Sequence, residues 1–239
     1  MPGSNPAHPL RQRRTHAQQR RETREALVIS ALNAFARDGY HAANLEGIAA
    51  EAGFSKGAVY SNFDGKSGLF LAAMDYNLET LRGEDWNPLR KADSGAVDPS
   101  AAQNADGVDA AGLVRGFGLA TLEFIATAAR DGDLVVALQQ RMQVMIGAYE
   151  RIAAQSRPAS ERLPVEDVAR LMAALDQGMS VLALSGITNI DGALARAGLN
   201  RLVDPFEAAG ESAPIRDGQA EPLADVARVQ RLIGDVLGT

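Results

Sequence analysis

The chain has no cysteine among its 239 residues and only three histidines, His8, His16 and His41. These absences exclude disulfide scaffolds, iron–sulfur clusters, Cys-ligated zinc and thiol nucleophiles, and the histidines have no metal-ligand spacing. No run approaches the roughly 18 apolar residues of a membrane-spanning helix, and the Arg-rich N-terminus lacks the apolar core of a secretion signal. We therefore expect a cytoplasmic protein with no metal, no cofactor and no membrane partner.

Catalytic signatures are equally scarce. The GKS triplet at 65–67 resembles the end of a phosphate-binding loop, but Tyr60 stands where that loop requires glycine, and no strand precedes it. Glu166 and Asp167 follow Pro164, where negative charge complements the start of a helix. The sequence therefore predicts no catalytic residues and a chain that is not an enzyme.

The net charge of −6 argues against a nucleic-acid partner, but it averages two unlike parts. Residues 1–70 hold nine basic and six acidic side chains, a formal charge of +3, which leaves −9 on the other 169 residues. Such a split indicates that one part meets a polyanion and the other does something else.

The sequence favours an all-α fold. Aromatic residues make up only 5% of the chain, and the apolar share is carried mainly by Ala, Leu and Val, of which Ala and Leu are good helix formers. No window shows sustained period-two alternation. Apolar residues recur at helical spacing in eight segments, approximately 22–39, 44–53, 55–63, 69–81, 112–130, 133–155, 165–187 and 223–237.

Three stretches lack this pattern. Residues 1–19 contain three prolines and several arginines, which predicts a disordered basic arm. Residues 83–111 are rich in Gly, Pro, Asp, Ser and Asn and are interpreted mostly as a loop, a lid or a linker, with Trp86 as an anchor to the body. A third polar stretch is expected at 204–221.

Segments 44–53 and 55–63 have the pattern of a helix-turn-helix, two short helices joined by a tight turn that contains Gly53. If the second helix turns Val59 and Phe63 inward, then Gly57, Ala58, Tyr60 and Ser61 must point outward. Its start, at Ser55, Lys56 and Gly57, offers free N–H groups to a phosphate oxygen. Lys66 near the next helix start opposes the helix dipole, which a phosphate partner would explain.

The stretch from Thr23 to Met74 resembles the DNA-binding domain of the TetR family of transcriptional regulators. The resemblance is carried by four motifs, FxxxGY at 35–40, LxxIA at 45–49, AGFSKG at 52–57 and YxxFxxK at 60–66. It implies that Ser55, Lys56, Gly57 and Tyr60 lie at the DNA, that Lys66 contacts a backbone phosphate, and that Ala58, Ser61 and Asn62 share the recognition helix. Ala43 and Asn62 depart from the Thr and His that are frequent in the family.

The resemblance divides the chain into a DNA-binding domain at 20–66 and an all-α effector-binding and dimerisation domain at 67–239. The effector pocket is expected between helices 67–82, 112–130, 133–155 and 165–187, with the candidates Phe117, Phe124, Met142, Met145 and Tyr149. By periodicity alone the stripes of 165–187 and 223–237 are ordinary core. The resemblance instead places them in a homodimer interface, with the candidates Val168, Leu171, Leu175, Met179, Leu182, Val226, Val229, Ile233 and Val236.

The first hypothesis is therefore a homodimeric repressor that a small, partly apolar effector releases from a palindromic double-stranded DNA operator. An activator is an alternative, and so is a helical ligand-binding or interaction protein with weakened DNA reading. The recognition helix has no Arg or Gln for bidentate base contacts, so specificity is expected from Tyr60, Ser61, Lys56, the Ala58 methyl group and DNA shape.

Overall fold

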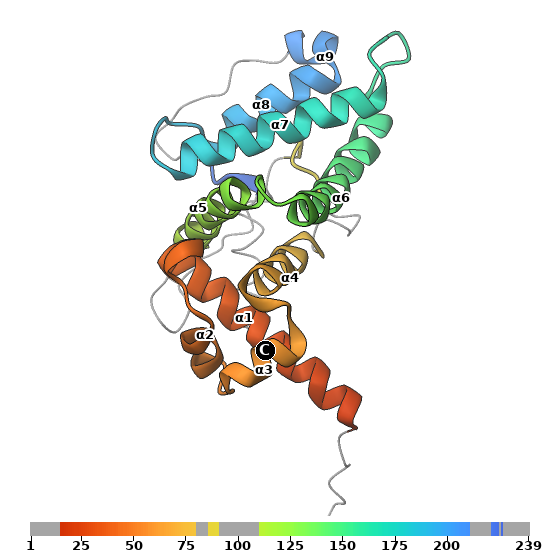
Figure 1. Cartoon of the computed structure of the whole chain (residues 1–239). Coiled ribbons are helices and arrows are strands. Elements are labelled where there is room, and N and C mark those ends of the chain that lie inside the picture. Colours follow the sequence, from red (N-terminus) through yellow and green to blue (C-terminus); the bar gives the residue numbers. More distant parts are fainter. Residues whose placement is uncertain (1–14, 80–85, 91–109, 211–220, 225, 227–239) are drawn as a thin grey trace, which may run out of the picture.

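The computed structural model in Figure 1 describes residues 15–79, 86–90, 110–210, 221–224 and 226. Over these ranges the regular structure is helical and contains no strand, which confirms the all-α prediction. Within the same ranges no helix combines the length and the apolarity that a bilayer crossing requires.

Helix α1 (His16–Ala42) begins earlier than the expected Glu22, because the side chain of Thr15 accepts a hydrogen bond from the Gln18 N–H and caps it. Residues 16–19, assigned to a disordered arm, are therefore helical, while residues 1–14 lie outside the described part of the chain. Gly39, at φ 78°, interrupts the helical backbone where the sequence predicts a stop.

The helix-turn-helix follows as predicted. The side chain of Asn44 accepts a hydrogen bond from the Gly47 N–H at 2.8 Å and caps α2 (Leu45–Glu51). Gly53 turns the chain at φ 78° into α3 (Lys56–Asn62). Ser55 occupies the N-cap position of α3 without a side-chain capping bond. A second turn at Gly65 opens α4 (Gly65–Glu79).

The rest of the described chain forms α5 (Ala110–Ala128), α6 (Gly132–Ser156), α7 (Val165–Leu184), α8 (Gly192–Val203) and α9 (Pro205–Gly210). Helix α8 is absent from the sequence prediction, and α9 contradicts the polar stretch predicted at 204–221. A local signal for α8 was present, because Asp191 caps it and Ala195, Leu199 and Val203 are buried at spacings of four. Of the helix expected at 223–237, only residues 223, 224 and 226 are described.

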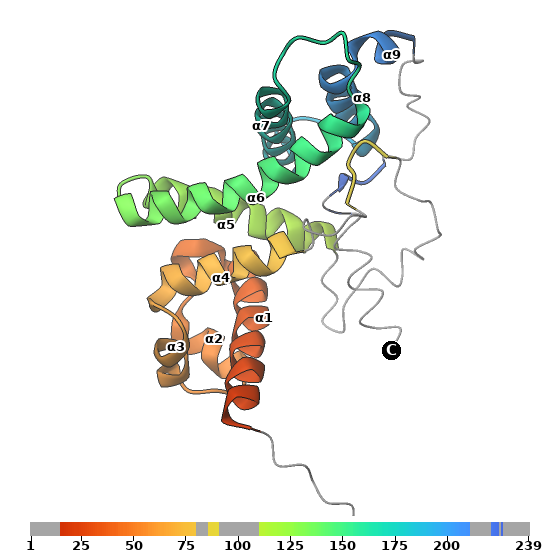
Figure 2. The same ribbon diagram turned by 90° about the vertical axis from the view of Figure 1, so that its right-hand side faces the viewer.

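Two hydrophobic cores divide the molecule. The first joins α1–α4 with Ala120, Phe124 and Ala128 of α5. Its centre is aromatic, with the Phe70 ring centroid 4.8 Å from that of Phe35 and 4.7 Å from that of Phe124. The second joins α6, α7 and α8 with Leu223 and Val226. In Figure 2, α4, α5 and α6 lie between α1–α3 and α7–α9, so α4 and α5 are packed with the N-terminal helices as well as with the body.

Candidate nucleic-acid interface and cavity

Helix α3 presents one face to the core and the other to solvent. Val59 is fully buried, Phe63 is nearly so, and Tyr60 keeps 59% of its surface exposed. The exposed set also contains Ser55, Lys56, Gly57 and Ser61. Ala58 departs from the prediction, because it is half-buried and packs against the first core.

The last residues of α3 direct their side chains back onto the helix. The Ser61 hydroxyl donates to the carbonyl of Ala58 at 3.0 Å, and the Asn62 amide donates to the same carbonyl at 2.8 Å. Asn62 is half-buried, and its Oδ1 is shielded from solvent. A base contact by Asn62 therefore requires its side chain to leave this position.

Two arginines of α1 hold the C-terminal end of α3. Arg24 donates to the carbonyl of Asn62 at 2.7 Å, and its guanidinium lies 4.3 Å from the centroid of the Phe63 ring. Arg20, one turn earlier, donates to the carbonyl of Ser61 at 3.4 Å. This role is not predicted by the sequence pattern, in which the only local signal is the spacing of four between the two arginines. They satisfy carbonyls that a helix end leaves without partners.

Arg37 joins α1 to α2 in a similar way. Its guanidinium donates to Glu51 at 2.8 Å and to Asp38 at 2.9 Å. These two carboxylates raise the pKa of Arg37, and the guanidinium lowers the pKa of Asp38 through their hydrogen bond. The first helix of the helix-turn-helix is thus fastened to the helix that also holds α3.

Lys66 has a hydrogen-bond partner within the chain, so its position at the start of α4 does not require a phosphate to explain it. Its ammonium group donates to the carbonyl of His41 at 2.8 Å and lies 5.0 Å from the centroid of the Tyr40 ring. Burial lowers the pKa of Lys66, and the carboxylate of Glu123 acts in the opposite direction. The placement of Lys66 is therefore explained within the chain, although an ammonium with three donors can serve a phosphate as well.

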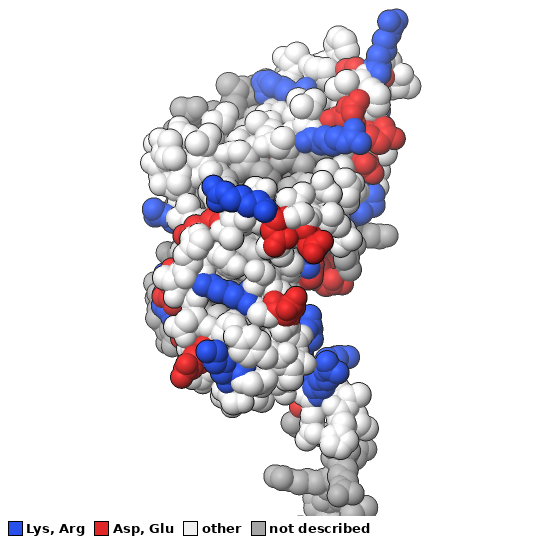
Figure 3. All heavy atoms as spheres, in the orientation of Figure 1, with Lys and Arg blue, Asp and Glu red and all other residues white. Residues whose placement is uncertain are grey.

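Figure 3 shows Lys and Arg side chains exposed over the α1 and α3 end of the molecule on the face that it draws. Within the described residues, the Lys and Arg side chains of α1–α4 are Arg20, Arg21, Arg24, Arg37, Lys56 and Lys66. Arg11, Arg13 and Arg14 lie outside the described residues.

A cavity of about 1410 Å³ opens between α1, α4, α5, α6 and α7. Of the predicted pocket residues, Phe117, Met142 and Met145 line it. Phe124 and Tyr149 do not line it and are fully buried in the first and second core, respectively. Packing explains why these two predicted residues are not in the wall. Phe124 is enclosed by aromatic rings, and Tyr149 packs against Trp86 with ring centroids 5.1 Å apart. That contact also confirms Trp86 as an anchor to the body.

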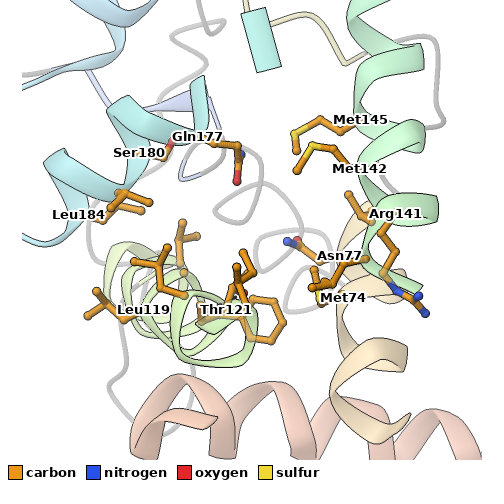
Figure 4. A pocket seen from close by; sticks show the side chains of 18 of the residues that line it. Met74, Asn77, Leu119, Thr121, Arg141, Met142, Met145, Gln177, Ser180 and Leu184 are labelled. Atoms are coloured by element: carbon orange, nitrogen blue, oxygen red, sulfur yellow. Dashed lines mark hydrogen bonds between the residues drawn. The ribbon is translucent and has the colours of Figure 1, made fainter. Parts of the chain in front are cut away.

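The cavity wall is mainly apolar, with amide and hydroxyl groups at intervals and the ionisable residues Glu79, Arg115 and Asp176. Figure 4 shows Asn77 of α4 and Gln177 of α7 directed inward from opposite sides, with Met74, Met142 and Met145 beside them. The guanidinium of Arg141 is turned away, because it donates to Asp75 at 2.6 Å and to the carbonyl of Leu71 at 3.3 Å. The prediction from the sequence included helices 67–82 and 165–187 but named no residue of either for the pocket, and it did not include α1, whose Leu32, Asn33 and Ala36 also line the cavity.

The predicted interface residues fall into three groups. Val168, Met179 and Val226 are buried in the second core, so they are not available to a second copy. Leu175 is half-buried, whereas Leu171 and Leu182 are 48% and 39% exposed, and Leu182 lines the cavity. Val229, Ile233 and Val236 lie outside the described residues. Val168 and Met179 are buried because both α6 and α8 pack against α7, and α8 was not predicted from the sequence.

Comparison with known proteins places residues 27–73, the segment from mid-α1 to mid-α4, in the family described as bacterial regulatory proteins, tetR family. The helix-turn-helix of this chain is a TetR-family domain. The TetR domain thus coincides with the helices whose caps and turns are described above.

Two curated relatives each match a part of the chain. The HTH-type transcriptional activator FasR of Mycolicibacterium smegmatis is 39% identical over 69 residues, which cover 29% of this chain and 32% of FasR. The HTH-type transcriptional regulator YerO of Bacillus subtilis is 38% identical over 55 residues, or 23% of this chain and 19% of YerO. The matches thus span a third or less of each relative's length.

A longer similarity is seen in a solved structure. A protein from Rhodococcus sp. described as a TetR-family transcriptional regulator has a TM-score of 0.51 and 21% identity, covering 75% of this chain and 95% of its own. At this identity the comparison shows a shared fold for the body, with the TetR domain at its N-terminal end.

Proposed function

We propose that the chain is a homodimeric, ligand-responsive transcriptional regulator that binds a palindromic operator through α3. The observation that carries this proposal is the exposed face of α3, with Tyr60 59% exposed, inside the segment that matches the TetR family. Residues 20–66 would bind DNA, and residues 67–239 would bind the effector and the second copy. A single short helix-turn-helix buries too little surface to bind tightly, so two half-sites on a two-fold dimer are physically expected.

On the DNA, α3 would lie in the major groove. Tyr60, Lys56 and Ser61 are exposed in positions to meet base edges or phosphates. Ser55 and Gly57 would let the start of the helix approach a phosphate, and Lys66 would contact a second one. Ala58 and Asn62, both half-buried, contribute less to this proposal than the sequence suggested.

The effector would be a small molecule that is largely apolar. The cavity of about 1410 Å³ is large enough for such a ligand, and ligand pockets combine an apolar wall with a few polar groups. Three of the six methionines of the chain line it, which gives the wall an adaptable shape.

We further propose that the operator-bound form represses and that the effector releases it, since a ligand acts by binding one conformation better than the other. FasR, a curated relative, is named an activator. The competing proposal is therefore that the operator-bound form activates transcription instead of repressing it.

A gel-shift screen of the DNA flanking the gene of this protein tests the proposal. We expect one fragment to be retarded in the presence of excess non-specific duplex, and we expect its footprint to cover an inverted repeat. Failure to retard any fragment would contradict the DNA-binding role and favour a helical ligand-binding protein. A reporter gene placed behind the retarded fragment then separates repression from activation.

A further inference from the structure

Helix α5 is in contact with both the cavity and the TetR domain. Leu119, Leu122 and Ile125 on one side of it line the cavity. On the other side, Gly116 meets α1 so closely that a Cβ there would lie 2.0 Å from the carbonyl oxygen of Ala36. Because the backbones of the two helices touch here, we expect a shift of α5 along α1 to move the end of α1 as well. Figure 1 shows α5 directly beside the C-terminal end of α1.

Glu123 of α5 reaches the end of α1. Its Oε2 accepts a hydrogen bond from the backbone N–H of His41 at 3.0 Å. Its Oε1 lies beside Gly39, where a Cβ would be only 2.8 Å away. Gly39 is the positive-φ interruption of α1, so the carboxylate binds the short segment that follows this break.

The same peptide segment is bound from the DNA-binding side. The carbonyl of His41 accepts a hydrogen bond from Lys66, in the first turn of α4, at 2.8 Å. Lys66 follows α3 after a single turn at Gly65. The backbone of His41 therefore connects the carboxylate of Glu123, on α5, with the ammonium group of Lys66, which follows α3.

We propose that the hydrogen bond from His41 N–H to Glu123 transmits occupation of the cavity to the TetR domain. This inference rests on the proposed function and assigns a residue to its regulation. A ligand that displaces Leu119 and Leu122 displaces Glu123 with them, which releases or pulls the end of α1 and shifts Lys66 and the start of α4. Glu123 is in this account a positioning residue, since it touches neither the ligand nor the DNA.

The experiment uses a tethered surrogate for the ligand. Gly178 of α7 lines the cavity, and a Cβ there meets nothing within 4 Å, so Gly178→Leu places an apolar side chain in the cavity from the wall opposite α5. The affinity of the full-length protein for its retarded DNA fragment is measured by fluorescence anisotropy with and without Gly178→Leu. Couplings between sites are typically 5–150-fold, so we expect a change of at least about fivefold.

Two variants of Glu123 then separate hydrogen bond from charge. Glu123→Gln keeps the length and an oxygen acceptor, whereas Glu123→Asp keeps the charge but is one methylene too short to reach the His41 N–H. In the Glu123→Gln background, we expect Gly178→Leu still to change the DNA affinity by at least about fivefold. In the Glu123→Asp background, we expect the change to be less than about twofold. Glu150→Ala, on α6, is the matched control that should retain the effect.

The inference would be overturned if Gly178→Leu changed the DNA affinity equally in the Gln and Asp backgrounds, or changed it only in the Asp background. It would also be overturned if Gly178→Leu did not change the DNA affinity of the wild-type protein. If the wild-type protein binds no fragment, the proposed function fails first, and the two failures are thus distinguishable. Hydrogen exchange of the segment 39–43 provides a readout independent of DNA. Exchange should rise in Glu123→Asp and not in Glu123→Gln or Glu150→Ala, and an unchanged rate in Glu123→Asp would contradict the hydrogen bond.

Discussion

Arg24 of α1 donates a hydrogen bond to the backbone carbonyl of Asn62, 38 residues later, at 2.7 Å. The same guanidinium covers the ring of Phe63. The orientation of α3 thus depends on a side chain outside the helix-turn-helix itself.

Arg24→Ala should lower the free energy of unfolding by about 1–2 kcal/mol, because it removes a charge-assisted hydrogen bond and a cation–π contact at a partly exposed site. Urea unfolding followed by circular dichroism measures this. Arg21→Ala, at an exposed position of the same helix, should stay within about 0.5 kcal/mol of wild type. Equal stabilities of the two variants would show that the Arg24 contacts contribute nothing.

Lys66→Ala should weaken DNA binding and reduce the slope of log affinity against log salt by about one charge. It should also cost about 1 kcal/mol of stability, because the carbonyl of His41 loses its donor. Lys56→Ala, at an exposed site, should reduce the slope without the loss of stability. An unchanged slope for Lys66→Ala would restrict Lys66 to its structural role.

Gly178→Leu should reduce ligand binding in the cavity. N-phenyl-1-naphthylamine is an uncharged apolar probe whose fluorescence rises in such sites, and we expect saturable binding to the wild-type protein. The added side chain should weaken that binding at least about fivefold, since it removes cavity volume that the probe would fill. Gly147→Leu, on α6 outside the cavity, is the control for the change in helix propensity. Equal probe affinities would place the binding elsewhere.

Leu171→Arg should dissociate the proposed dimer. Leu171 is 48% exposed on α7, and the exposed Ala174 continues its apolar stripe at helical spacing. A buried, unpaired charge at a two-fold interface occurs twice and is therefore strongly unfavourable. Sedimentation velocity should show a dimer for the wild type and for Arg170→Ala, and a monomer for Leu171→Arg. A dimer in all three would move the interface away from this stripe.

The helix-turn-helix could be predicted from the sequence because its boundaries are set locally. The cap at Asn44 and the positive-φ glycine at position 53 are encoded within a few residues of the helices that they bound. The inward side of α3 follows from the spacing of Val59 and Phe63 alone.

The environment of the body residues could not be predicted in this way. Val168 and Leu171 belong to one apolar stripe of α7, yet Val168 is buried by the core and Leu171 faces solvent. That difference depends on where α6 and α8 pack against α7, which no local pattern specifies. The partner of Lys66 is similarly remote, because His41 lies 25 residues earlier and is brought near only by the packing of α1 against α4.

The central claim is that the exposed face of α3 binds DNA, and Tyr60→Ala tests it most directly. Because Tyr60 is 59% exposed, its removal should leave the unfolding free energy within about 0.5 kcal/mol of wild type. Affinity for the retarded fragment, measured by anisotropy at fixed salt, should fall by roughly 1–3 kcal/mol. Phe206→Ala, which removes an exposed aromatic ring of α9 outside the cavity, should bind DNA like the wild type. Wild-type affinity and footprint in Tyr60→Ala would contradict the account.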